Sequence, residues 1–312
     1  KTGALVSGRP GVLAFEGAYH GLTLGSLAAT PRAHFRALFV ERLYGGVAFA
    51  PFPDAMRDDG PEGAHSLREV ERLLDRGAPN GDAIGTIVVE PVQARGGARV
   101  PPDGFMAALS DLAASRSVTI VADEIFTGIG RCGAMLASGR VGLRPDIVCV
   151  GKSLGAGLPI SACIGSADVM DAWPDSTGEA IHTSTFLGHP LACAAAIRVL
   201  DTMADGSVAA EIDRVGASIL AGLRSRLDDV RAVGDIRGLG LLLGIELVEE
   251  DGTTKAAGAG VRVAEQVLRD GIISLPAGDL GEVYELTPPV VLTDEQRDHA
   301  LDRIARAIVE TS

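Results

Sequence analysis

The chain has 312 residues, of which 46% are hydrophobic and 22% charged, as in ordinary globular proteins. Its net charge of -13 argues against a general nucleic-acid-binding protein, because no basic surplus is available to neutralise phosphates. No apolar run approaches the roughly 20 residues that a membrane span requires, so we expect neither nucleic acid nor membrane as a partner.

The cysteines and lysines narrow the chemistry further. The four cysteines lack CxxC spacing, so we expect no metal site and no disulfide framework, and a reducing cytoplasm fits best. Of the 28 basic residues, only Lys1, Lys152 and Lys255 are lysines. A mid-chain lysine is therefore informative, because arginine replaces lysine on most surfaces but cannot form an imine.

Up to about residue 205, short apolar runs alternate with longer helical patterns. This alternation predicts an α/β fold with a mainly parallel sheet covered by helices. The runs are apolar or β-branched throughout, as in strands that are covered on both faces. The expected strands lie at residues 12–15, 86–90, 118–123, 147–150 and 161–164. Helices are expected at 105–115 and 190–203.

Beyond residue 205 the organisation changes. One amphipathic helix is expected first, and its apolar face consists of Ile212, Val215, Ile219, Leu223 and Leu227. A glycine-punctuated strand pair at 237–247 and a helix near 261–269 follow. The last helix begins at a capping box formed by Thr293 and Gln296, and its expected buried face is Leu301, Ile304 and Ile308. We predict a large domain over 1–205 and a smaller α+β domain over 206–312.

Lys152 follows an apolar strand and lies in a glycine-rich turn, where a backbone or a cofactor can approach closely. It can be read as a surface lysine. A phosphate-binding P-loop is a second reading, but that pattern requires glycine at position 146, which is Asp146. The third reading is a Schiff-base lysine, made nucleophilic by partial burial and by neighbouring charge.

Asp123 is the partner that the third reading needs. Pyridoxal 5′-phosphate (PLP) accepts electrons best when its ring nitrogen is protonated, and a buried carboxylate must hold that proton. Asp123 ends an apolar strand, where the active sites of open α/β sheets collect. An aspartate after a strand is also a common cap. Asp123 and Lys152 are about one crossover apart, and the pair is more specific than either residue.

Five motifs occur in order along the chain. They are Phe15-Glu-Gly-Ala-Tyr-His-Gly21, Glu90-Pro-Val-Gln93, Asp123-Glu-Ile-Phe-Thr-Gly128, Gly151-Lys-Ser-Leu-Gly-Ala-Gly157 and Thr183-Ser-Thr-Phe-Leu-Gly-His-Pro190. Together they closely resemble the class III aminotransferases of PLP fold type I, from Val12 to the C-terminus. The resemblance implies PLP as the cofactor, small amine and carbonyl substrates, and a homodimer with shared active sites.

The resemblance also implies roles for single residues. Lys152 would bind the cofactor as an imine and move the substrate proton, and Asp123 would pair with the ring nitrogen. The other residues implied to be near the cofactor are Tyr19 on one ring face, His20, Glu90 orienting Asp123, Ile125 on the opposite face, and Thr185 reaching the cofactor of a neighbouring subunit. Taken singly, these residues would be read as core, caps or solvated charges.

The sequence departs from the family pattern at three places. A small-residue turn that holds the PLP phosphate precedes the matching region in the family and is not found here, so we expect a trimmed or disordered segment before Lys1. Members that act on ornithine have an arginine where this chain has Leu22. They also have glutamate and arginine where this chain has Arg95 and Glu285, so those two charges are exchanged. Leu22, Arg95 and Glu285 are therefore candidates for the substrate site, although either charged residue alone would be read as a solvated surface charge.

These patterns predict a cytoplasmic, PLP-dependent aminotransferase. It would move an amino group from an ω-amine, diamine or amino-sugar donor to a carbonyl acceptor by a ping-pong Schiff-base mechanism. Two alternatives stay open at this point. One is another PLP reaction on the same fold, such as decarboxylation, racemisation or an aminomutase reaction. The other is a catalytically silent homologue that serves as a binding module.

Overall fold

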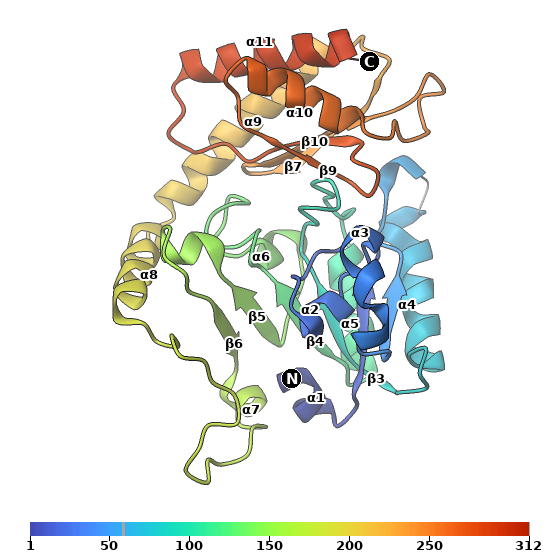
Figure 1. The fold of residues 1–312 in the computed structure, drawn as a ribbon, viewed down its shortest axis with the longest axis vertical. Coiled ribbons are helices and arrows are strands. Elements are labelled where there is room, and N and C mark those ends of the chain that lie inside the picture. Colours follow the sequence, from blue (N-terminus) through green and yellow to red (C-terminus); the bar gives the residue numbers. More distant parts are fainter. Residues whose placement is uncertain (58–59, 312) are drawn as a thin grey trace.

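The computed structural model describes residues 1–57 and 60–311, and these form two sheets (Figure 1). The larger sheet has six strands in the order β2-β1-β3-β4-β5-β6, and the smaller has four in the order β7-β8-β10-β9. The first five strands of the larger sheet pair in parallel, whereas β6 runs antiparallel to β5. The predicted α/β class with a mainly parallel sheet is therefore confirmed.

The strands of the larger sheet lie close to the predicted ones. Their bounds are β1 Gly11–Phe15, β2 Val47–Ala50, β3 Ile84–Val89, β4 Thr119–Asp123, β5 Ile147–Val150 and β6 Ala162–Gly165. Strand β2 was not predicted. The expectation that every strand is covered on both faces is wrong for β6, where Ile164 is 53% exposed. Strand β6 is an edge strand, but so is β2, which is mostly buried, so the edge position alone does not explain the exposure of β6.

Helices cover both faces of the larger sheet. Successive side chains of a strand point to opposite faces. One set packs with α4 (Ala64–Arg76) and α5 (Phe105–Ser115) in a core that includes Leu13, Phe15, Ile87, Val89 and Ile120. On the other face, Ala14 and Val47 pack with α2 (Leu24–Ala28), and α1 (Thr2–Ser7) contacts β3 and β4. The helix predicted at 105–115 is confirmed.

The smaller sheet has its own helices and core. Its strands are β7 Val233–Leu239, β8 Leu242–Leu247, β9 Leu275–Ala277 and β10 Val283–Leu286, and its helices are α9 Ser207–Leu227, α10 Ala259–Arg269 and α11 Asp294–Thr311. The predicted faces of α9 and α11 are buried in this core, as expected. The capping box is confirmed: Thr293 N–H donates to Gln296 Oε1 (3.0 Å), and Gln296 N–H donates to Thr293 Oγ1 (3.2 Å).

The remaining elements are mostly short. They are α3 Ala33–Arg36, η1 Ala37–Arg42, η2 Ala55–Arg57, η3 Pro61–Gly63, α6 Ala137–Val141, η4 Lys152–Gly155, α7 Ala167–Met170 and α8 Pro190–Met203. The proposed domain boundary near residue 205 falls between α8 and α9, and the division into domains stays a prediction. Within the described ranges, no helix has both the length and the apolar character needed to cross a bilayer.

The site lies where the two sheets meet. The loop after β3 is packed between them, because Val92, Ala94 and Ala98 share a small core with Leu242 of β8. Figure 1 shows the smaller sheet above the carboxyl ends of β4 and β5. The smaller sheet thereby partly covers the carboxyl ends of these parallel strands.

Candidate active site

Asp123 and Lys152 lie at adjacent strand ends. Strands β4 and β5 are parallel neighbours with Asp123 opposite Cys149, and Lys152 comes three residues later. Lys152 has a φ of 41°, which places a non-glycine residue in the sparsely populated left-handed region. A cavity of about 110 Å³ lies beside both side chains. It is lined by Tyr19, His20, Gly21, Glu90, Ala94, Arg95, Asp123, Ile125, Phe126 and Lys152.

Lys152 is an exposed residue, and its Nζ lies 4.5 Å from the centre of the Phe126 ring. The pKa of Lys152 is below its ordinary value. Partial desolvation is the largest cause, and with Arg95 it outweighs the attraction of Asp123, Glu90 and Glu285. A lowered pKa increases the fraction of neutral amine, which is the nucleophilic form.

Asp123 is held on two sides. Its Oδ2 lies 2.7 Å from His20 Nδ1, and its Oδ1 accepts a hydrogen bond from the backbone N–H of Ile125 at 3.1 Å. Burial lowers the pKa of His20, but the hydrogen bond to Asp123 and the charges of Asp123 and Glu90 outweigh it, so the pKa is raised overall. His20 Nε2 is buried without a hydrogen-bond partner in the described part of the chain. No role for His20 beyond cofactor contact was predicted.

The part that Glu90 plays in orienting Asp123 stays a prediction, and its observed hydrogen bonds go to the backbone. Its carboxylate accepts backbone N–H groups from Tyr19 at 2.9 Å and from Ala94 at 3.1 Å. Burial raises the pKa of Glu90 to about 7, although His20 and the two N–H groups act against that rise. Glu90 therefore fixes the two segments that flank the cavity, and His20 is the side chain that contacts Asp123.

The two exchanged charges lie on different elements, Arg95 in the loop after β3 and Glu285 in the smaller sheet. Arg95 lines the cavity, and its guanidinium carbon lies 6.0 Å from the centre of the Tyr19 ring. Glu285 is in β10, is only 3% exposed, and has one carboxylate oxygen without a hydrogen-bond partner among the described residues. Burial raises the pKa of Glu285 to about 7 despite the positive charges of Arg95, Lys152 and Arg131. No ion pair joins Arg95 to Glu285 within residues 1–57 and 60–311.

Two features of this site escaped prediction. Phe126 contacts the Lys152 amine, although it was read only as part of a motif. Glu124 is fully buried, and its carboxylate accepts the backbone N–H groups of Ala137 (3.1 Å) and Ser138 (2.7 Å). This anchor fixes the turn after β4 and so presents Ile125 to the cavity. The sequence signal that could have predicted this is the pair of neighbouring acids, Asp123 and Glu124. Two successive side chains at a strand end point to opposite sides, so only one of the two carboxylates faces the site.

The structure does not bring every predicted residue to the cavity. Leu22 is 52% exposed between His20 and α2. Thr185 is exposed in a turn just before α8. Neither of them lines the 110 Å³ cavity, and the same holds for the predicted substrate residue Glu285. Any contact that they make with a cofactor or a substrate stays a prediction.

The residues present fit pyridoxal phosphate. The cofactor needs an amine with a lowered pKa, which Lys152, an exposed residue, supplies. It also needs a buried carboxylate for its ring nitrogen. Asp123 is 8% exposed, is fixed by His20 and Ile125, and lines both the 110 Å³ cavity and a neighbouring one of about 380 Å³. The donor set is therefore that of a PLP enzyme.

Comparisons with known proteins agree with this geometry. The family model for class III aminotransferases matches residues 2–308. The 5-aminovalerate aminotransferase of Pseudomonas aeruginosa is 34% identical over 312 residues, covering 99% of this chain and 71% of that protein. The 4-aminobutyrate aminotransferase of Mycobacterium bovis is 34% identical, covering 97% of this chain and 69% of that protein.

Solved structures show the same likeness. An amine transaminase from an uncultivated Pseudomonas species, in its PLP-bound form, superposes with a TM-score of 0.88 at 27% identity, covering 100% of this chain and 72% of the other. An aminotransferase of Bacillus anthracis gives a TM-score of 0.89 at 25% identity, with 99% and 72% covered. With the site geometry, these matches establish that the chain belongs to the class III aminotransferases, which are PLP-dependent transferases of fold type I.

Proposed function

We propose that this aminotransferase takes its amino group from an ω-amine, diamine or amino-sugar donor and passes it to a small carbonyl acceptor. The observation that carries the proposal is the Glu285 carboxylate, which is buried with one unpartnered oxygen on the side of the site that belongs to the smaller sheet. A buried unpaired carboxylate is costly unless a cation or a hydrogen-bond donor binds it. A second ammonium group or the hydroxyls of an amino sugar meet that need.

Lys152 and Asp123 carry the chemistry in this proposal. When bound, pyridoxal phosphate supplies an aldehyde that condenses with amines and a ring that withdraws electrons. Lys152 Nζ would hold the cofactor covalently, and it would move a proton from the amine-bearing carbon of the donor to the cofactor in the first half of the reaction and from the cofactor to the acceptor's carbon in the second. Asp123 holds the proton of the ring nitrogen, and its bonds from His20 and Ile125 keep the carboxylate in place.

Tyr19 and Ile125 line the same cavity as these two residues. We assign them the two faces of the cofactor ring, from which their apolar surfaces exclude water. Glu90 supports this arrangement because it accepts the backbone N–H of Tyr19. Fixed apolar walls strengthen the attraction between the charged groups inside the cavity, since water no longer screens them.

Arg95 is the residue that we assign to the acceptor. Its guanidinium lies beside Tyr19 at the cavity wall, and a guanidinium binds carboxylates through paired hydrogen bonds. A 2-oxo acid such as pyruvate presents that group. The two relatives compared above are named for 5-aminovalerate and 4-aminobutyrate, which are ω-amino acids with a distal carboxylate. Leu22 and Glu285 offer that carboxylate no positive charge, so we propose a preference for donors that carry a second cation instead.

Donor ranking tests this proposal. Cadaverine, an amino sugar and 5-aminovalerate are compared as donors to pyruvate, with the wild type and with Glu285→Gln. We expect cadaverine to have the higher kcat/KM in the wild type and to lose about tenfold in the variant, which corresponds to about 1.4 kcal/mol. The 5-aminovalerate rate serves as the internal control and should stay constant or rise. An identical ranking in both proteins would show that Glu285 does not contact the donor.

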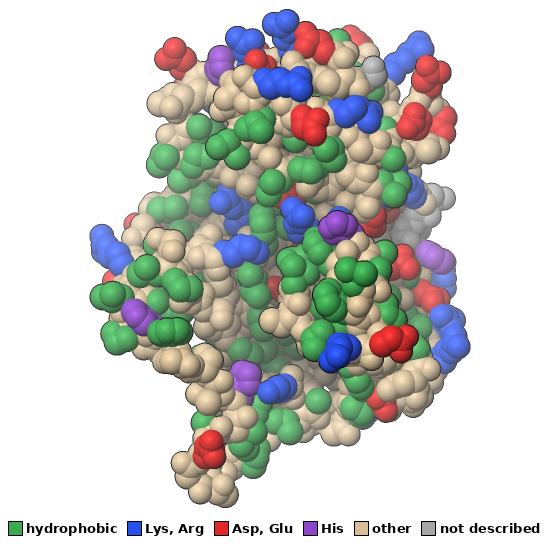
Figure 2. Space-filling view, in the orientation of Figure 1, with side chains coloured by type: hydrophobic (Ala, Val, Ile, Leu, Met, Phe, Trp, Pro, Cys, Tyr) green, Lys and Arg blue, Asp and Glu red, His purple; other side chains and the backbone are tan. Residues whose placement is uncertain are grey.

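We also propose that the protein assembles as a homodimer. Apolar side chains are exposed along the segment from β6 through α8, namely Ile164, Ile181, Phe186, Leu187, Leu191 and Ile197. Figure 2 shows such side chains gathered over the region of α8. Large exposed apolar patches mark protein interfaces, and Thr185 lies within this segment, where the family pattern brings it to the partner's cofactor. The cytoplasm is the compartment that we propose, and four free thiols support it.

A further inference from the structure

Arg95 is carried on a tight loop, residues 93–99, which we call the Arg95 loop. Two hydrogen bonds between Gln93 and Arg99 close it, at 3.1 and 2.9 Å, and Ala98 N–H donates to Ala94 O at 3.0 Å. Gly97 and Ala98 both have positive φ angles, 113° and 48°. Alanine adopts such a φ only when its surroundings hold it there, so the shape of this loop depends on contacts from outside.

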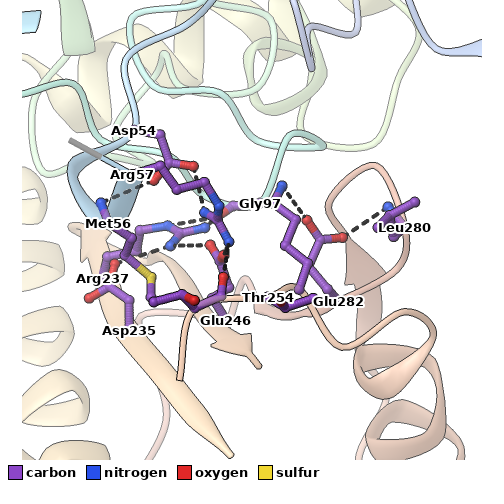
Figure 3. Close-up of polar contacts among 12 residues, drawn as sticks. Asp54, Met56, Arg57, Gly97, Asp235, Arg237, Glu246, Thr254, Leu280 and Glu282 are labelled. Atoms are coloured by element: carbon purple, nitrogen blue, oxygen red, sulfur yellow. Dashed lines mark hydrogen bonds and ion pairs between the residues drawn. The ribbon is translucent and has the colours of Figure 1, made fainter. Parts of the chain in front are cut away.

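The smaller sheet provides those contacts through Arg237 of β7. The guanidinium of Arg237 donates twice to the buried carbonyl oxygen of Gly97, from Nε at 3.0 Å and from Nη2 at 2.8 Å (Figure 3). Strand β8 also approaches closely. A Cβ built on Gly244 would lie 3.0 Å from both the Ala98 Cβ and the Gly97 oxygen. The backbone of the loop is thus seated against β7 and β8.

Glu246 of β8 orients Arg237. Its carboxylate is 1% exposed and lies 2.7 Å from Arg237 Nη1 and 2.6 Å from Arg57 Nη2 (Figure 3). Burial acts to raise the pKa of Glu246, but the charges and hydrogen bonds of Arg237 and Arg57 outweigh it, so the pKa is lowered. Each of the two arginines has a further carboxylate partner. Asp235 lies 3.1 Å from Arg237, and Asp54 lies 2.6 Å from Arg57.

The other end of the loop is held independently. Arg32 Nη1 donates to the Arg95 carbonyl oxygen at 2.8 Å, and Gly278 N–H donates to the same oxygen at 3.0 Å. Arg32 Nη2 also donates to Gly278 O at 2.6 Å. Because these bonds hold position 95 from one side, loss of the Gly97 contact would tilt the loop and leave the fold intact.

We propose that Arg237, oriented by Glu246, is a positioning residue that sets the direction in which Arg95 points and thereby governs binding of the acceptor's carboxylate. This inference rests on the proposed role of Arg95. A charged network that only stabilised the fold would affect both substrates alike. The Arg95 loop carries one substrate-facing charge, so its displacement affects the carboxylate substrate selectively.

Steady-state kinetics and hydrogen exchange of the holoenzyme test the inference. Arg237→Met should raise the KM for pyruvate about tenfold, while kcat and the KM for pentylamine, a donor without a carboxylate, change less than twofold. Mass-detected exchange should show faster exchange of the amides at 94–99. Glu246→Gln is nearly isosteric and keeps the packing, so it should change both readouts in the same direction. Arg237→Lys should restore part of the pyruvate KM, because the ammonium keeps a donor for Gly97.

Arg226→Met is the matched control. Like Arg237, Arg226 contacts a carboxylate and a backbone carbonyl, but its partners, Asp302 at 2.7 Å and Gly222 O at 3.1 Å, both lie within the smaller sheet's helices. This variant should leave both readouts at wild-type values. Equal increases in both KM values, or unchanged exchange at 94–99 in Arg237→Met and Glu246→Gln, would overturn the inference.

The variant Arg95→Met distinguishes a failure of the proposed role of Arg95 from a failure of the inference about Arg237. A wild-type KM for pyruvate in that variant means that the proposed role of Arg95 is wrong. A raised KM there, together with wild-type exchange and KM in Arg237→Met, means that the inference about Arg237 alone is wrong.

Discussion

At the scale of single residues, burial has moved the ionisable groups of the site away from their ordinary pKa values. Desolvation lowers the pKa of Lys152 and raises those of Glu90 and Glu285 to about 7, whereas the pairing with Asp123 raises the pKa of His20. Perturbed groups that converge on one cavity are typical of catalytic sites. Their chemistry therefore depends on pH in ways that can be measured.

Lys152→Arg should abolish turnover without unfolding the protein, because arginine keeps the positive charge but cannot form an imine. In the wild type, borohydride reduction followed by peptide mapping should place the cofactor on Lys152. Circular dichroism provides the control for the fold. Label on Lys1 or Lys255, with none on Lys152, would contradict the assignment.

The donor preference should depend on pH through Glu285. Its folded pKa of about 7 lies above the ordinary value of 4.5, so its carboxyl is mostly neutral at pH 6 and mostly ionised at pH 8. Only the ionised form attracts a second ammonium group. The positive charges of Arg95, Lys152 and Arg131 oppose that rise in the pKa of Glu285, whereas the negative charge of Glu90 adds to it.

The measurement is the ratio of kcat/KM for cadaverine to that for pentylamine. Because both donors must lose a proton from the reacting amine, the ratio cancels that shared dependence. We expect the ratio to rise through about pH 7, by at most tenfold per pH unit, in the wild type. In Glu285→Gln it should be flat. A flat ratio in both proteins would remove Glu285 from donor binding.

At the scale of elements, local sequence patterns predicted most strands but not most helices, since α4 and the short helices α1, α2, α3, α6 and α7 were not predicted. The long helices α5 and α8 have the predicted bounds, and α11 begins at the predicted capping box. Strand β2 was missed, as were β9 and β10. These strands are three or four residues long, but so are the predicted strands β5 and β6, so length alone does not explain why β2, β9 and β10 were missed. They are defined by hydrogen bonds to distant strands.

The capping box of α11 gives a prediction at this scale. Thr293→Ala removes the side-chain acceptor for the Gln296 N–H and should lower the free energy of unfolding by about 1 kcal/mol. In a chain of this size, that change lowers Tm by about 2 °C. Thr293→Ser keeps the hydroxyl and should restore most of the loss. Equal stability of the alanine and serine variants would show that the cap contributes nothing.

At the scale of the whole molecule, the exposed apolar segment from β6 through α8 predicts assembly. Light scattering should give twice the chain mass, because an interface that builds an active site is typically large and apolar. Leu191→Asp should give a monomer with little activity, since Leu191 is 68% exposed within the patch. The control is Leu268→Asp, at a residue of α10 that is 58% exposed outside the patch. A fully active monomer would contradict the shared site.

The sequence by itself determined the fold class, most strands, the longer helices other than α4, and the two residues at the strand ends. Those features follow from local patterns: apolar runs, helical periodicity, and Asp123 and Lys152 placed directly after buried strands. Five motifs in order then identified the family, which the comparisons confirmed.

Only the tertiary structure decided which residues touch inside the site. His20 and Asp123 are 103 positions apart, and Arg237 and Gly97 are 140 apart. Glu90 binds backbone N–H groups, and Glu285 is buried with an unpartnered oxygen because β10 packs against the site. Such contacts depend on how the two sheets meet. A local pattern places a side chain on a face of its element, but it does not specify which distant group lies opposite that face.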